Sequence, residues 1–209
     1  MRLKNIFLAV AGVTVTVFSS HAQTVDEKFA AELKAKSADV RSIQCEFTQE
    51  RAIAVLNDKI LKEGDFYFRN TGDMLLAFDD GDHIVMADGW FESKTSGRVT
   101  ATSIKSNPML GNLSAILGAC ISGDMESLSE EFSLEISDAS ASEWEVVMLP
   151  KKKRASSKLQ QIVLRFDKST MSLNKLIFME RGSDYTEYRF SGKRFNIDID
   201  DKLFTISKQ

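Results

Sequence analysis

Histidine and cysteine are scarce in this chain of 209 residues, which contains two of each. His21 lies close to the N-terminus, so His83 is the one histidine in the body of the chain, residues 23–209. A single histidine does not build a zinc site without thiolates or carboxylates at suitable spacing. A serine or cysteine triad would have to use His83, and the sequence has no nucleophile-elbow motif. We therefore expect no metal site and no catalytic residue, and we interpret His83 as a surface residue of a strand.

A glycine-rich phosphate loop and a calcium loop are missing as well. The acidic run at residues 79–82 lacks the spacing and the terminal glutamate of a calcium-binding loop. Other acidic residues, such as those at 126–131, fall in turns or on a polar helix face, where solvated charge is the common explanation. A glycosidase needs only two carboxylates that face each other across a cleft, so hydrolysis of carbohydrate or lipid stays open as a third hypothesis. We expect a protein that is not an enzyme and has no cofactor.

Long apolar runs are limited to the N-terminus, at residues 6–18. This run is shorter than the roughly 20 residues that a bilayer-spanning helix needs. Basic residues precede it, and small residues at positions 20 and 22 suit a signal peptidase. A lipidated protein would have cysteine directly after the cut, where this chain has Gln23. We therefore expect residues 1–22 to be a signal peptide that is removed, and the mature product to be exported from the cytoplasm and soluble.

The body of the chain, residues 23–209, has the size of one domain and a net charge of −5. This balance argues against a nucleic acid partner. One dense basic block occurs, at residues 151–154, and it is typical of a solvated hairpin loop. The alternative for this block is contact with an anionic lipid surface or an acidic partner.

Cys45 and Cys120 allow two interpretations. In an oxidising compartment they can pair, and a bridge closing about 75 residues would stabilise the fold by roughly 4 kcal/mol. Both also stand among apolar neighbours, where a buried free cysteine acts as a small hydrophobic residue. The sequence leaves the disulfide as a possibility and favours the buried thiols.

Hydrophobic periodicity predicts a helix at the start of the domain. Thr24 and Glu27 have the spacing of a capping box. From Val25 to Val40, apolar residues recur at helical intervals with charged residues between them. The helix therefore presents one apolar stripe that must lie on another element.

The period changes to two from Ser42, which predicts strands. Turn residues separate these strands at short intervals, as in an antiparallel meander. Gly64 predicts a bulge or a close backbone approach within the second strand. The expected strands are at residues 42–55, 60–69, 74–78, 83–87, 90–94, 98–104, 132–136, 144–149, 159–166, 173–179, 185–190 and 195–199.

An uncharged segment interrupts the strands at residues 107–120. Pro108 suits the first turn of a helix and Gly123 suits its exit. A helix that is apolar on all sides is normally buried. The patterns therefore predict a mainly β protein with helices (α+β), in which an N-terminal helix and an inserted apolar helix accompany a curved antiparallel sheet or barrel.

Large apolar side chains are abundant, with 14 phenylalanines and 8 methionines. Methionine adapts to varied partners, although an ordinary core explains this excess equally well. A curved sheet with an uncharged helix over its mouth also makes an apolar ligand cavity. Both interpretations stay open on composition alone.

Several stretches resemble the periplasmic outer-membrane lipoprotein carriers of LolA type. They cover most of the chain after the leader, and their order and spacing carry the resemblance more than any one motif. The matching stretches are Phe47-Thr48-Gln49, Gly64-Asp65-Phe66-Tyr67-Phe68-Arg69, residues 84–89, residues 107–120 and Phe204.

The resemblance implies an unclosed antiparallel β-barrel or strongly curved sheet, covered by the N-terminal helix and an inserted apolar lid helix. It also implies a carrier that binds the acyl chains of a lipoprotein in an apolar cavity and hands them to an outer-membrane acceptor. Each buried methylene contributes about 0.8 kcal/mol, so acyl chains do not cross water unaccompanied. For each implied lining residue the alternative is an ordinary core position. The implied lining residues are Phe47, Phe66, Phe68, Met74, Leu76 and Met86 from strands, and Leu110, Leu113, Ile116 and Leu117 from the lid helix.

The chain departs from the family pattern after the second strand. An arginine-proline pair usually stands there, the arginine helping to hold the lid, and this chain has Asn70 and Thr71. Arg69 lies one position early, which is the opposite face of a strand. Arg69 is the candidate for the lid latch if a bulge turns it toward the lid.

The leading hypothesis is a periplasmic carrier for lipoproteins or a related acylated amphiphile. Its implied partners are acylated lipoproteins, an inner-membrane release complex and an outer-membrane acceptor, with transient membrane contact, and we expect a monomer. The alternative is an envelope lipid-sensing or protein-binding domain of the same fold that transports no cargo.

Overall fold

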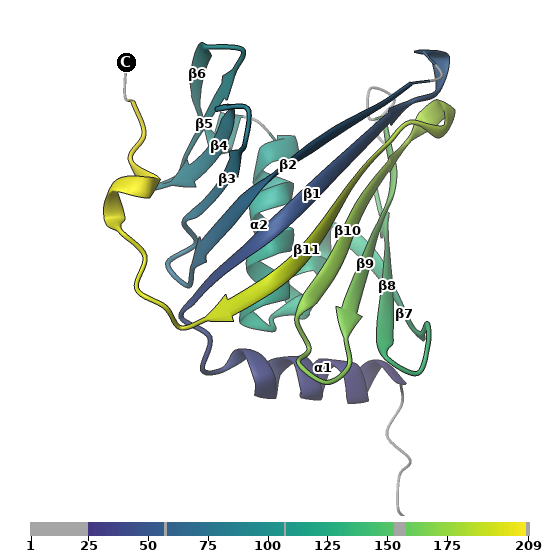
Figure 1. Cartoon of the computed structure of the whole chain (residues 1–209). Coiled ribbons are helices and arrows are strands. Elements are labelled where there is room, and N and C mark those ends of the chain that lie inside the picture. The colour runs from purple at the N-terminus through teal and green to yellow at the C-terminus, as the bar shows by residue number, and fades with distance from the viewer. Residues whose placement is uncertain (1–24, 57, 107, 153–157, 208–209) are drawn as a thin grey trace, which may run out of the picture.

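The computed structural model of the chain describes residues 25–56, 58–106, 108–152 and 158–207 (Figure 1). The expected signal peptide and residues 153–154 of the basic block lie outside the described residues. Within them, no helix has the length and apolar character needed to cross a membrane.

One antiparallel sheet of 11 strands dominates the fold, in the order β6-β5-β4-β3-β2-β1-β11-β10-β9-β8-β7. β6 and β7 form its two edges, so the sheet does not close. Figure 1 shows that the sheet is curved, and both features agree with the prediction from the sequence. The strands are β1 (Ser42–Ile53), β2 (Asp58–Arg69), β3 (Met74–Phe78), β4 (His83–Ala87), β5 (Trp90–Thr95), β6 (Arg98–Ser103), β7 (Phe132–Asp138), β8 (Glu143–Pro150), β9 (Leu159–Asp167), β10 (Leu173–Glu180) and β11 (Tyr185–Phe195).

Two α-helices lie against this sheet, α1 (Val25–Ser37) and α2 (Pro108–Ser122). Figure 1 shows α1 crossing one end of the sheet and α2 standing inside its curve. Both helices were expected from the sequence. Short 3-10 turns complete the chain at η1 (Ala54–Leu56), η2 (Ile104–Ser106), η3 (Met125–Glu130), η4 (Arg181–Ser183) and η5 (Asp201–Phe204).

The main core fills the space between the concave face and the two helices. The apolar stripe of α1 supplies Phe29 and Leu33, which are fully buried. The Phe29 ring meets Trp144 and Phe166 edge to face, with centroids 5.9 and 5.2 Å apart. Such pairs stabilise a core beyond simple burial. The period-4 stripe predicted for this helix is therefore what fixes it to β8 and β9.

The second half of α2 buries Ile116, Leu117 and Cys120 against the sheet and exposes Ala115. Gly123 ends the helix with a φ of +79°, which favours glycine. A Cβ at Gly123 would lie 2.9 Å from the backbone of Lys34, so α1 and α2 approach closely there. The exit that the sequence assigns to Gly123 is confirmed.

Gly64 marks a close approach. A Cβ at this position would lie 2.0 Å from the carbonyl oxygen of Ala77. β2 keeps a regular register through Gly64, with Phe47 on one side and Phe78 on the other, so there is no bulge. The Phe47 and Phe78 rings meet edge to face with centroids 5.2 Å apart. Glycine is therefore required by the backbone of the neighbouring strand.

The sequence predicts two separate strands at residues 185–190 and 195–199, and this division is wrong. β11 is continuous from Tyr185 to Phe195, and residues 196–200 are not a strand. Ser191 pairs with Glu46 and Arg194 pairs with Gln44, so three steps along β11 match two along β1. Gly192, with a φ of +62°, lies in this bulge. The break predicted between residues 190 and 195 is therefore a bend in a continuous strand.

The segment after β11 covers part of the convex face of the sheet (Figure 1). Ile199 and Phe204 pack there with Leu75 and Val85 in a second, smaller apolar cluster. β3 is therefore buried on both faces, because its alternate residues face the main core.

Candidate ligand cavity

The structure brings the predicted lining residues together in one core. Ile116 and Leu117 of α2 are at most 3% exposed and face the apolar side of the sheet. The side chains of Leu110 and Leu113 lie outside the described residues. The strand residues of the prediction are all buried in the same cluster: Phe47, Phe66, Phe68, Met74, Leu76 and Met86.

A cavity borders this core, at the end of the sheet next to α1. Phe66 and Leu117 are the predicted residues that line it. Its volume is about 40 Å³, which is room for roughly three water molecules. The cavity is too small for an acyl chain in this structure, so binding a chain requires α2 and the sheet to separate. Its apolar lining also includes Val40, Ile43, Met171, Leu173, Phe190 and Phe195.

The bulge in β11 gives the cavity two of its lining residues. Phe190 faces the concave side and is buried. In a regular strand, residues 192 and 194 would follow it on that face. The extra residue at the bulge shifts the alternation, and Lys193 and Phe195 line the cavity instead. The sequence analysis missed both residues because it ended the strand at this point.

The turn between β9 and β10 supplies another wall. The Asp167 carboxylate accepts hydrogen bonds from the N–H groups of Ser169 and Thr170, at 2.9 and 2.8 Å. These hydrogen bonds and those from the two hydroxyl groups lower the pKa of Asp167. Met171 follows with a φ of +54°, an uncommon conformation for a residue with a side chain, and is buried at the cavity.

Lys193 is a half-buried charged residue in the cavity lining. Its Nζ donates to Ser172 Oγ at 3.1 Å and to Asn174 Oδ1 at 2.5 Å. Burial lowers the pKa of Lys193 from its ordinary value, and the Asp167 and Glu143 carboxylates oppose the shift. Lys36 also lines the cavity, but it is exposed on α1.

Cys45 and Cys120 both line this cavity as free, buried thiols. Burial raises the pKa of Cys45 to about 12 and that of Cys120 further still. A thiol that stays protonated is a poor nucleophile and metal ligand. The two residues therefore act here as small apolar wall residues, and the disulfide that the sequence left open is not formed.

Arg69 does not have the role predicted for it. β2 keeps its register to the end, where Arg69 pairs with Ser42, so Arg69 lies on the opposite face from Phe68. Its guanidinium group binds Asp73 at 3.2 Å, contacts Asp201, and lies 4.3 Å from the ring centroid of Phe204. Arg69 thus clamps the C-terminal segment to the convex face, and the lid-latch prediction is corrected.

His83 lies at the start of β4, as expected, with a partner that the sequence did not reveal. Its Nε2 lies 3.0 Å from Glu92 Oε1, and the Ser207 N–H donates to Glu92 Oε2 at 2.7 Å. Burial alone would raise the pKa of Glu92, but these hydrogen bonds lower it below its ordinary value. Alternation places Glu92 on the convex face, and the segment folded over it causes its burial. Among the described parts of the chain, no three His, Cys, Asp or Glu side chains form a group able to hold a metal ion.

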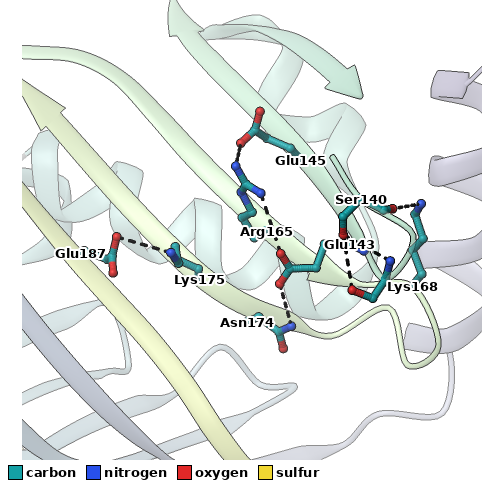
Figure 2. A network of polar contacts seen from close by, with 9 residues as sticks. Ser140, Glu143, Glu145, Arg165, Lys168, Asn174, Lys175 and Glu187 are labelled. Carbon is teal, nitrogen blue, oxygen red and sulfur yellow. Dashed lines mark hydrogen bonds and ion pairs between the residues drawn. The ribbon is translucent and has the colours of Figure 1, made fainter. Parts of the chain in front are cut away.

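Strands β8, β9 and β10 carry a polar network (Figure 2). Arg165 lies 2.5 Å from Glu145 and 3.8 Å from Glu143. The Asn174 amide donates to Glu143 at 3.2 Å. The same amide accepts the hydrogen bond from Lys193, so the network orients a group at the cavity.

Comparisons with solved structures find similar chains at low identity. An uncharacterized conserved protein from Thermus thermophilus is 8% identical, with a TM-score of 0.52 over 88% of this chain and 96% of that chain. A putative outer membrane lipoprotein-sorting protein domain from Vibrio parahaemolyticus is 14% identical, with a TM-score of 0.46 over 87% and 97%. A chain of the Pseudomonas aeruginosa MucA/MucB complex is 14% identical, with a TM-score of 0.47 over 86% and 60%. The likeness to the Thermus structure supports the fold and says nothing about function.

A sequence comparison with curated proteins gives no significant match. The family model described as "Outer membrane lipoprotein carrier protein LolA" matches residues 38–207. This range contains the whole sheet, α2 and the C-terminal segment, and it leaves α1 outside. The chain therefore belongs to the LolA family.

Proposed function

We propose that this protein is an exported carrier that binds the acyl chains of lipoproteins, or of a related acylated amphiphile, between α2 and the concave face. Residues 1–22 are the signal peptide in this proposal, and the carrier works in the periplasm. It takes its cargo from an inner-membrane release complex and hands it to an outer-membrane acceptor. The function is binding rather than catalysis.

The observation that carries the proposal is the chemistry of α2. The helix has no charged residue over its whole length, Pro108–Ser122. Its described buried residues contact the phenylalanine- and methionine-rich face of the sheet. An acyl chain offers the same kind of contact, at about 0.8 kcal/mol for each methylene buried. An acyl chain that enters this space therefore replaces the apolar contacts between α2 and the sheet with apolar contacts of its own.

The small size of the cavity indicates that the structure represents a closed state, with α2 packed on the sheet. The space is filled by the protein's own side chains, so cargo binding includes the cost of moving α2. That cost lowers the apparent affinity, because only the open fraction binds. A carrier benefits from this, since a moderate affinity lets the next binder take the cargo without nucleotide hydrolysis.

Displacement of a neutral dye tests the proposal. The mature protein, residues 23–209, is titrated with Nile red, and a triacylated lipopeptide is then added. We expect dye fluorescence to rise on binding and to fall as the lipopeptide displaces it. The same peptide without acyl chains is the control and should leave the signal unchanged. Lack of dye binding together with lack of lipopeptide binding would contradict the proposal.

Transfer between vesicles separates a carrier from the alternative, a lipid-sensing or protein-binding domain. Donor vesicles contain a fluorescent lipoprotein, and acceptor vesicles contain none. We expect the protein to accelerate movement of the label to the acceptor vesicles. Binding of lipopeptide without any transfer favours the sensing domain.

A further inference from the structure

Lys193 is placed in the apolar cavity by a specific feature of the backbone. The bulge at Gly192 turns the side chain of Lys193 to the concave face, where Phe190 and Leu173 line the same cavity. Without the bulge, Arg194 would take this place and Lys193 would face outward. The fold therefore brings an ammonium group into an apolar site, where a cation is costly.

The hydrogen-bond partners of Lys193 carry no charge. Among the described residues, its Nζ donates to Ser172 Oγ and Asn174 Oδ1, which are both neutral. Glu143 and Asp167 act on it only through space. Burial lowers its pKa, and this effect outweighs the attraction of the two carboxylates.

Asn174, one of the two neutral hydrogen-bond partners of Lys193, is itself held in position by other contacts. Asn174 is the extra residue of an irregularity in β10, where Leu173 pairs with Phe166 and Lys175 with Arg165. Its amide nitrogen donates to Glu143, which leaves the amide oxygen for Lys193. Glu143 is in turn paired with Arg165 (Figure 2). This chain of contacts from Arg165 through Glu143 to Asn174 therefore holds the ammonium group of Lys193 at the cavity.

We propose that Lys193 binds an anionic head group, a carboxylate or a phosphate, of the acylated molecule that this protein carries. This inference rests on the proposed function and adds the head-group chemistry of the cargo. The acyl chain occupies the space under α2, and the head group stays at the cavity beside Lys193. Thr170 and Ser172 line the cavity close by, and their hydroxyl groups are hydrogen-bonded to each other.

The pairing is favourable because of where the cation lies. An ion pair gains most in a site of low dielectric, and the usual penalty for burying a cation has been incurred before the ligand arrives. A charge-assisted hydrogen bond contributes more than a neutral one. The same head group on the exposed lysines of α1 would gain little.

Competition between matched amphiphiles tests this inference. Dodecanoate, dodecyl phosphate and the neutral glyceryl ester of dodecanoic acid displace Nile red from the mature protein at pH 7. We expect one or both anions to bind roughly tenfold more tightly than the neutral ester, the effect of one hydrogen bond between charged groups. The ratio between the two anions distinguishes a carboxylate cargo from a phosphate cargo.

Two variants assign the effect to Lys193. Lys193→Gln keeps a hydrogen-bond donor and removes the charge, and it should reduce the preference for the anions to about twofold or less. Arg194→Gln is the matched control, since Arg194 is adjacent, exposed and on the other face of β11. It should keep the full preference.

The pH profile of the wild-type protein provides a test without any variant. Raising the pH removes the proton of Lys193 at a lower pH than in an ordinary lysine. The preference for the anions should therefore disappear on the alkaline side. The other titratable groups at the cavity are Lys36, Cys45 and Cys120, and Cys45 keeps its proton to about pH 12.

Three outcomes overturn the inference. Equal binding of the anions and the neutral ester contradicts it and leaves the proposed function standing. An anion preference that survives both Lys193→Gln and high pH shows that Lys193 is not the binding group. Failure of all three amphiphiles to bind contradicts the proposed function as well.

Discussion

Two covers lie on opposite faces of the same sheet, and they are held by different forces. α2 covers the concave face with uncharged residues that bury Ile116 and Leu117. The C-terminal segment covers the convex face of β3 and β4 with an apolar anchor, Phe204, and with charged contacts through Arg69 and Glu92. Both covers exclude water from apolar strands.

The difference indicates which cover can move. Apolar contacts are non-directional, so an acyl chain can replace those of α2. Hydrogen bonds to a buried carboxylate require matched partners, and breaking them leaves a polar group unsatisfied. We therefore interpret α2 as the exchangeable cover and the C-terminal segment as a fixed clamp.

A charge placed under α2 should produce the largest effect. Leu117 is 3% exposed, and Leu117→Glu puts a carboxylate into the apolar space. We expect loss of Nile red binding and a fall of about 3 kcal/mol in the free energy of unfolding. Phe68→Glu should do the same from the sheet side. Both quantities are measured by dye titration and urea unfolding.

The matched control for this change is Ala115→Glu on the exposed side of α2. It should change the free energy of unfolding by less than about 0.5 kcal/mol. Dye binding that survives in folded Leu117→Glu protein would contradict the proposed position of the ligand.

Removing the anchor of the convex cover should lower stability without affecting binding. Phe204 is 5% exposed beneath the guanidinium group of Arg69. Phe204→Ala should lower the free energy of unfolding by about 2 to 3 kcal/mol and leave dye affinity unchanged. Leu203→Ala, at an exposed neighbour, should have little effect. Loss of dye binding in Phe204→Ala would show that the two covers are coupled.

Glu92 gives the clamp a dependence on pH. Its pKa in the folded protein lies below the ordinary value of 4.5, so the ionised carboxylate stabilises the fold above pH 4.5. This contribution is lost as the pH falls below 4.5 through the folded-state pKa. Glu92→Gln should lower the free energy of unfolding by about 1 to 2 kcal/mol at pH 7. The difference from wild type should shrink in acid, and a constant difference would contradict this assignment.

The bulge at Gly192 should matter for binding as well as for stability. Gly192→Ala puts a side chain at a φ of +62°, at a cost of about 1 kcal/mol. We also expect the preference for anionic amphiphiles to fall, because Lys193 loses its place. Gly97→Ala is the control, with a φ of +79° in the β5–β6 turn. It should cost the same stability and keep the preference, and an equal loss of preference in both variants would contradict this role for the bulge.

The smallest expected effect is a gain. Lys193→Met replaces a half-buried cation with an apolar side chain of similar length. We expect the free energy of unfolding at pH 7 to rise by about 0.5 kcal/mol while the anion preference disappears. A loss of stability in thermal or urea unfolding would show that Lys193 is structural.

Simple periodicity was sufficient for most of the fold. Ile43, Cys45 and Phe47 alternate with polar residues, and all three are buried on the concave face. The uncharged segment after Pro108 forms the expected helix inside the sheet. These elements follow from local patterns, since one face of a strand or helix must be buried.

The position of the cavity could not be derived in this way. It depends on the bulge at Gly192, which reverses the alternation for Lys193 and Phe195, and on the left-handed φ of Met171. The burial of Glu92 depends on a segment that is 115 residues away in sequence. Such features arise from register and tertiary contact, which the pattern of one segment does not contain.

Hydrogen–deuterium exchange of the mature protein, with and without the triacylated lipopeptide, tests the position of the ligand most directly. We expect the lipopeptide to change exchange in α2 and in the strands beneath it, and to leave residues 196–207 unchanged. Unchanged exchange in α2 at a saturating lipopeptide concentration would contradict acyl-chain binding between α2 and the sheet.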